Sequence, residues 1–269
     1  MRKMILLVSV ILMLAIPVSA GASPDNGSTL GTAIKIEPLT QEETNYLRSH
    51  VGLSETEIST LPETMLRQMI DMQVVKVASK SQSFSENPTT GEIQPSLDAN
   101  DLTLQTLTTV QASDKPGYKK YNMWGYFSWK KDPVAVFTDK MTIGVPESVG
   151  FFLPVSNNSI SQFTSTYEYN KNGTWYSKQS TTPSDWKANS GVAGKYDLVS
   201  GTNYLHRGYI SQNIYINSSK SDTTNLTLEY GHSTVSFEPS VSISPTSGSI
   251  GITIKPGVSV YKIPYEFKY

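Results

Sequence analysis

The spacing of apolar residues differs between the N-terminal and C-terminal parts of the chain, and helical spacing governs residues 40–78. Thr40 is a candidate helix N-cap with Glu43 as its capping-box partner, and Ser54 restarts the signal with Glu55 and Glu57 in the first turn. A third helix is predicted to begin at Pro62. Its apolar positions, spaced for one broad stripe, are Met65, Leu66, Met69, Ile70, Val74 and Val77. The pattern predicts a small helical module.

Beyond Gly117 the apolar residues alternate with polar ones. The strand-like segments of residues 118–269 are rich in Tyr, Val, Ile, Thr and Phe, and Gly, Asn, Ser and Pro clusters separate them. Asn172-Gly173 is a strong signal for a two-residue hairpin turn. Because no helical pattern intervenes, we expect a mainly β fold, an antiparallel β-sandwich of jelly-roll or Ig-like type, with Trp124 and Trp129 in its core.

Residues 79–117 are rich in Ser, Thr, Asn, Gln and Pro and offer few apolar anchors. We therefore interpret them as a linker with one possible strand at Leu102 to Val110, where apolar and polar residues alternate. Residues 21–39 contain a small, polar stretch and are expected to form a flexible start.

The N-terminus has the order of parts of a secretory signal peptide. Arg2 and Lys3 precede an apolar run that ends at Ile16, and small residues lead to a cleavage site after Ala20. The run is shorter than the ~20 residues of a spanning helix. We therefore predict a signal peptide at residues 1–20 and a secreted, extracellular protein without a stable transmembrane anchor.

The charge balance and the absence of cysteine limit the classes of partner and chemistry to be expected. The chain has 22 Lys and Arg and 23 Asp and Glu, and removal of Arg2 and Lys3 leaves 20 against 23, a net charge near −3. This balance does not favour nucleic acid or anionic lipid as a partner. The sequence contains no cysteine, which excludes disulfides, a lipid-bearing cysteine and cysteine catalysis.

The motifs of common catalytic and cofactor sites are not found. The sequence contains no G-x-S-x-G motif, glycine-rich phosphate loop or EF-hand loop, so no catalytic residue and no cofactor is assigned and an enzyme is not favoured. His206 and His232 could bind a metal together with Asp197 or Glu229. Their aromatic and glycine neighbours favour buried hydrogen-bonding roles, and no metal site is assigned.

The excess of aromatic residues points to a binding protein. Trp175 and Tyr176 follow the Asn172-Gly173 turn, and Asp185 and Trp186 lie in a nearby loop. If exposed, these four residues could stack on sugar rings and hydrogen bond to them; core packing would give the same composition. We expect a non-enzymatic binding protein whose partner is a cell-wall or extracellular polysaccharide, or another protein.

Two alternatives remain open. The Ser/Thr-rich alternation from Ser221 to Lys255 is typical of amphipathic hairpins in membrane-active, pore-forming β proteins, and equally of a sandwich strand that buries one face. An unrecognised hydrolase is the second alternative, because paired carboxylates cannot be placed from sequence.

Several segments in this order carry a resemblance: "LTQEETNYLRSHVGLSETEISTLPETMLRQMI", "YFSWKKDPVAVFTDKMTIG", "AGKYDLVSG", "HRGYISQNIYIN" and "YGHSTVSFEPSVSIS". The chain resembles a group of uncharacterised exported proteins of spore-forming Gram-positive bacteria, in which a helical module precedes a β-rich region. The resemblance implies export and this architecture. The group has no established activity, so it implies no site residue.

Overall fold

A computed structural model describes residues 31–269 except 88, 92, 96–100 and 245. The predicted signal peptide and the first part of the predicted flexible start lie outside the described residues. In the part of the chain that is described, no helix combines the length and the apolar character needed to cross a membrane.

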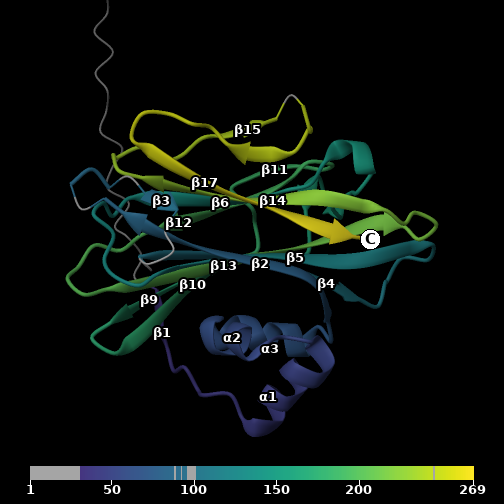
Figure 1. Ribbon diagram of the computed structural model, residues 1–269, viewed down its shortest axis with the longest axis horizontal. Helices are drawn as coiled ribbons and strands as arrows, with labels where there is room; N and C mark the ends of the chain where they lie inside the picture. The colour runs from purple at the N-terminus through teal and green to yellow at the C-terminus, as the bar shows by residue number, and fades with distance from the viewer. Residues whose placement is uncertain (1–30, 88, 92, 96–100, 245) are drawn as a thin grey trace, which may run out of the picture. The chain divides into compact units, whose positions relative to one another are not determined.

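Two antiparallel sheets make up most of the fold (Figure 1), as the sequence predicted. The larger sheet has eight strands, in the order β1 (Thr32–Ile34), β10 (Thr174–Ser180), β9 (Phe163–Lys171), β13 (Leu205–Asn217), β5 (Tyr118–Trp129), β4 (Leu102–Gln111), β2 (Val75–Glu86) and β3 (Ile93–Pro95). The smaller sheet has five, in the order β11 (Asp185–Lys187), β12 (Gly191–Asp197), β6 (Thr138–Gly144), β14 (Thr223–Ser233) and β17 (Val258–Lys268). Two short ribbons pair β7 (Val155–Ser156) with β8 (Ser159–Ile160) and β15 (Val241–Ile243) with β16 (Ile250–Ile252).

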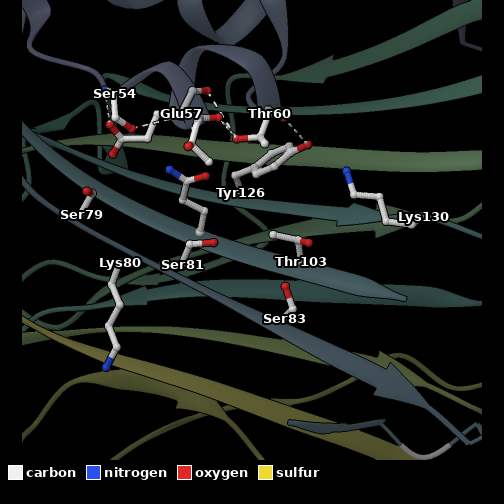
Figure 2. Close-up of a pocket in the computed structure, with 12 residues that line it drawn as sticks. Ser54, Glu57, Thr60, Ser79, Lys80, Ser81, Ser83, Thr103, Tyr126 and Lys130 are labelled. Carbon is white, nitrogen blue, oxygen red and sulfur yellow. Dashed lines mark hydrogen bonds between the residues drawn. The ribbon is translucent and has the colours of Figure 1, made fainter. Parts of the chain in front are cut away.

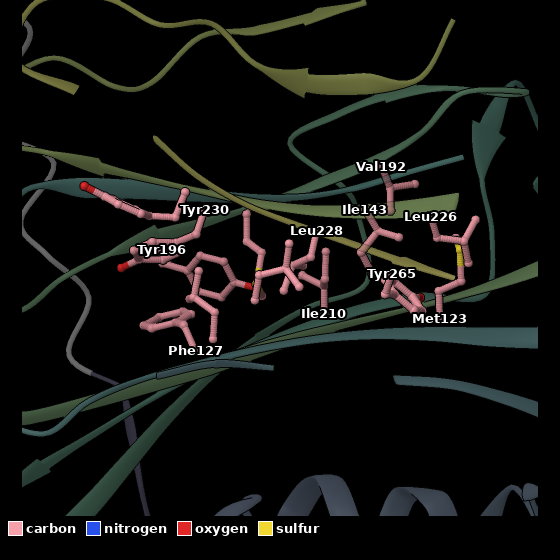
Figure 3. Packing of buried hydrophobic residues seen from close by; sticks show 14 of the residues in the cluster. Met123, Phe127, Ile143, Val192, Tyr196, Ile210, Leu226, Leu228, Tyr230 and Tyr265 are labelled. Atoms are coloured by element: carbon pink, nitrogen blue, oxygen red, sulfur yellow. The ribbon is translucent and has the colours of Figure 1, made fainter. Parts of the chain in front are cut away.

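Apolar side chains from both sheets form the main core (Figure 3), which includes Met123, Phe127, Ile143, Ile210, Leu228 and Tyr265. The alternation in β17 shows how the sequence specifies this layer. Tyr261, Ile263, Tyr265 and Phe267 are buried, whereas the residues between them are exposed. Because successive side chains of a strand point to opposite faces, one face of β17 joins the core and the other meets solvent.

The helical module consists of α1 (Gln41–Tyr46), a π-helical turn η1 (Leu47–Val51), α2 (Glu55–Thr60) and α3 (Glu63–Asp71). The predicted capping box of Thr40 with Glu43 is confirmed, and Ser54 forms a second capping box with Glu57, which was not predicted. A further helical turn, η2, spans Glu147–Val149.

The module covers the face of the larger sheet that is turned away from the smaller sheet (Figure 1). A second core forms there, where Met65, Leu66 and Met69 of α3 pack with residues of the sheet, namely Leu107, Trp124, Tyr126 and Tyr209. Both faces of β5 are therefore buried, one against the main core and the other against the second core. Trp124 and Trp129 are both buried, as predicted, but Trp124 belongs to the second core and Trp129 to the main one.

A buried ion pair fastens the module to the sheet. The Glu168 carboxylate on β9 is fully buried and accepts hydrogen bonds from Nε of Arg207 at 2.6 Å and from the Thr64 hydroxyl of α3 at 2.7 Å. Arg207 also pairs with Glu63 of α3 at 3.3 Å. Charged groups from both parts therefore hold α3 in place over the sheet.

Three predicted segments are wrong in part. The predicted flexible start at residues 21–39 contains β1, which pairs with β10 at the edge of the larger sheet. The third helix ends at Asp71, because Gln73 adopts a left-handed conformation with φ 51°, and Val77 lies in β2. The predicted linker at residues 79–117 contains most of β2 and all of β4, which pair with each other inside the larger sheet. The strand expected at Leu102 to Val110 is confirmed.

Candidate functional site

A groove of about 610 Å³ lies between α2 and the uncovered outer part of the larger sheet (Figure 2). The floor comes from three neighbouring strands and the wall from α2 and its N-cap. Its lining residues are Ser54, Thr56, Glu57, Thr60, Ser79, Lys80, Ser81, Ser83, Thr103, Gln105, Tyr126 and Lys130. The volume lies within the ~300 to 1,000 Å³ of small-molecule sites.

Hydroxyl groups dominate the lining because of the pairing of β2 with β4. Ser79, Ser81 and Ser83 alternate along β2 and share one face, and Ser81 and Ser83 pair directly with Gln105 and Thr103. The residues between these serines belong to the other face, where Phe84 is buried in the main core. One strand thus supplies both core and groove.

Gln105 is the most informative residue of the floor. It is only 4% exposed, yet its side-chain amide makes no hydrogen bond to any residue that the structure describes. The hydroxyls of Ser83 and Thr103 are likewise without a side-chain hydrogen bond within the described part of the chain. None of these polar atoms is among the fully buried atoms of the described residues that lack a partner, so they reach the solvent in the groove. The floor therefore presents donors and acceptors to the groove.

The wall of the groove is held in a fixed geometry. The Tyr126 hydroxyl donates to the backbone oxygen of Thr60 at 3.1 Å, which ties the end of α2 to β5. Glu57 Oε2 accepts from the Ser54 backbone N–H at 2.7 Å and from Lys76 Nζ at 2.6 Å. Burial raises the pKa of Glu57, but the hydrogen bonds from Lys76, Ser54 and Ser79 outweigh it and hold that pKa below its usual value. Glu57 is therefore a structural carboxylate in this wall.

The structure does not bring the four aromatic-surface candidates together. Trp175 and Tyr176 are consecutive on β10, so they point to opposite faces of the larger sheet. The guanidinium of Arg207 lies 4.0 Å from the Trp175 ring centroid. Tyr176 stacks on Tyr169 at 5.1 Å and packs against the main core.

The other two candidates lie on β11 of the smaller sheet. Asp185 accepts a hydrogen bond from Lys140 at 2.8 Å, and Trp186 is 39% exposed. The shared stacking surface predicted for Trp175, Tyr176, Asp185 and Trp186 is therefore replaced by separate environments on two sheets. The sequence signal for the groove was the alternation of serines in "ASKSQSFSE", which composition alone had assigned to a linker.

The histidines lie in separate sheets and have the buried hydrogen-bonding roles that the sequence favoured. His206 Nδ1 lies 2.7 Å from the Tyr167 hydroxyl, and His232 Nδ1 lies 3.0 Å from Asp139 Oδ2. The carboxylates considered as metal partners are engaged elsewhere, Asp197 with Thr138 and Glu229 with Lys262. Among the described residues, no three His, Asp or Glu side chains cluster as a metal site would require.

The segment considered for membrane insertion, residues 221–255, contains β14, β15 and β16. β14 is paired on both sides, with β17 and with β6. Ile252 is 6% exposed and packs over Gly231, whereas Ile254 is 82% exposed.

The sequence matches no protein-family model and no curated protein. Among solved structures, a pore-forming protein aligns over 72% of this chain and 91% of its own, with TM-score 0.36 and 6% identity. Clostridium perfringens delta-toxin aligns over 72% and 89%, with TM-score 0.32 and 8% identity. The Clostridium perfringens NetB toxin in its membrane-inserted form aligns over 71% and 97%, with TM-score 0.31 and 6% identity. These similarities are too weak to bear on function.

Proposed function

We propose that this chain is an extracellular binding protein that holds a glycan in the groove between α2 and the larger sheet. The observation that carries the proposal is Gln105, which is nearly buried at the groove floor and has no side-chain partner among the described residues. An amide both donates and accepts hydrogen bonds, as do the surrounding hydroxyls. A ligand with many hydroxyl groups satisfies such a lining from both directions.

The lining disfavours the other ligand classes. A lipid chain would leave the floor amide and hydroxyls without partners, at about 1 to 3 kcal/mol for each buried group. Single-stranded nucleic acid requires aromatic stacking platforms along a basic groove, whereas Tyr126 is the aromatic residue in this lining and is 2% exposed. The polar groove thus fits a sugar better than a fatty acid or a nucleic acid.

The lining also favours binding over hydrolysis. A glycosidase of the common type uses two carboxylates placed on either side of the bond that is cleaved. Glu57 is the carboxylate among the described lining residues, and it is engaged with Lys76 and the Ser54 backbone. The groove therefore offers positioning groups without a second acid.

The test is a binding screen of the secreted full chain against insoluble cell-wall polysaccharides and soluble oligosaccharides. A Gln105→Leu variant removes the floor amide while keeping a similar volume, and Gln179→Leu changes an exposed glutamine on β10 as the matched control. We expect Gln105→Leu to lose binding with little change in stability, because no internal hydrogen bond is lost. Equal glycan binding by wild type and Gln105→Leu, or no binding to any glycan, would contradict the proposal.

A further inference from the structure

The charged side chains that line the groove differ in whether another group of the protein pairs with them. Glu57 is balanced by Lys76 at 2.6 Å, a pair in which both side chains are largely shielded. Lys80 belongs to the opposite face of β2 from the serines, and its Nζ donates to the backbone oxygen of Pro264 at 2.8 Å. Figure 2 shows its side chain directed away from α2. These groups leave no free charge on the ligand side of the groove.

Lys130 differs from both lysines. It follows β5 directly, lines the groove and lies at the end opposite Ser54 (Figure 2). It is exposed, and its ammonium makes no ion pair with any carboxylate in the described part of the chain. Its neighbour Lys131 does have such a pair, with Asp101 at 3.0 Å. The uncompensated charge of the lining is therefore a single positive charge at one end.

We infer that the groove selects an acidic glycan, one whose sugar units carry a carboxylate, and that Lys130 is the residue that determines this selectivity. The inference rests on the proposed glycan function and adds the charge of the ligand. The hydroxyls and Gln105 hold the neutral part of the sugar, while Lys130 pairs with the acid group at the open end. Because this pair is exposed, its contribution is modest, about fivefold in affinity, and falls as salt screens it.

The experiment compares acidic glycans with their uncharged counterparts. Polygalacturonate, alginate and hyaluronate are each measured beside the same polymer after its carboxyl groups have been reduced to alcohols. We expect the wild-type full chain to bind the acid form about fivefold more tightly than the reduced form at low salt, with the difference shrinking at high salt. Lys130→Gln removes the preference, and Lys131→Gln, the matched control beside it, keeps it.

The outcomes distinguish a failure of the acid selectivity from a failure of the proposed glycan binding. If reduced and acid forms bind equally well, and Lys130→Gln changes nothing, the acid selectivity is refuted while glycan binding stands. A preference lost in Lys131→Gln but kept in Lys130→Gln also overturns the assignment. If neither form of any polymer binds and the wider glycan screen is also negative, the proposed function fails, and the selectivity fails with it.

Discussion

Two buried histidines give the stability of this fold opposite dependences on pH, and the effect of His206 can be worked out. His206 is 1% exposed, and its Nδ1 lies 2.7 Å from the Tyr167 hydroxyl. That hydroxyl oxygen also accepts the backbone N–H of Val199 at 3.0 Å. A neutral imidazole protonated on Nε2 accepts the hydroxyl proton at Nδ1. Burial lowers the pKa of His206 to about 4, against the opposing influence of Asp132 and Asp139.

The consequence for stability follows from proton linkage. A histidine in the unfolded chain titrates near pH ~6.5. Below that pH the unfolded state binds a proton that folded His206 does not bind, so stability is lost as the pH falls from about 6.5 toward 4. By pH 5.5 the loss relative to pH 7.5 amounts to about 1 kcal/mol.

His232 acts in the opposite direction and in a higher pH window. Burial alone would lower the pKa of His232. Asp139, which is hydrogen bonded to Nδ1, and the nearby Glu86 carboxylate raise that pKa by more than burial lowers it, so the net shift is upward. The stabilising contribution of His232 is therefore complete below pH ~6.5 and is lost as the pH rises through its folded pKa. The two histidines therefore contribute opposite pH dependences, one on the acid side of pH ~6.5 and one on the alkaline side.

Urea denaturation followed by tryptophan fluorescence at several pH values between 5.5 and 8 measures these terms. His206→Gln is expected to remove the loss of about 1 kcal/mol at pH 5.5, and His232→Gln to remove the loss on the alkaline side. His50→Gln, at an exposed position in η1, is the matched control and keeps the wild-type curve. The reasoning is refuted if His206→Gln retains the acid slope of the wild type, whatever its absolute stability.

Three further outcomes are expected. Glu168→Ala leaves Arg207 largely buried without its main partner and should cost about 3 to 5 kcal/mol in urea denaturation; a loss below about 1 kcal/mol would mean that the pair does not fasten the module. A fragment of residues 118–269 should not unfold cooperatively by circular dichroism, since it lacks four strands of the larger sheet, β1 to β4, and a sharp transition would contradict this. Ile252→Lys should lower the melting temperature by several degrees, because it buries a charge, while the exposed Ile254→Lys should leave it unchanged. Equal shifts of the two variants in calorimetry would contradict the burial of Ile252.

The elements that the sequence predicted best depend on local hydrogen bonds. Thr40 and Ser54 cap helices whose partners stand three residues away, so the signal and the bond lie in the same short segment. The Asn172-Gly173 turn is equally local: both residues have positive φ, 52° and 84°, and they join β9 directly to β10. No tertiary contact is needed to specify these features.

The strand β2 shows why the predicted linker was wrong. Its serines give it a polar composition typical of a loop, and its regular structure depends on pairing with β4 about two dozen residues later. Phe84 and Glu86 are buried near its end, and Ala78 packs against the main core nearer its start. Composition averages the two faces of a strand, whereas the fold uses each face separately.

The groove arises from how far the helical module extends over the larger sheet. The module buries the apolar part of the outer face, including Leu107 and Tyr126, and leaves the serine-bearing part of β2 open beside α2. Gln105 lies between these two regions, where it is only 4% exposed and still lines the groove. Gln105 is positioned by the pairing of β4 with β2 and β5, whereas α2, the wall of the groove, belongs to the helical module that Glu168 of β9 contacts through Thr64 of α3. The wall and the floor of the groove are therefore held by separate contacts, the wall by those of the helical module and the floor by strand pairing.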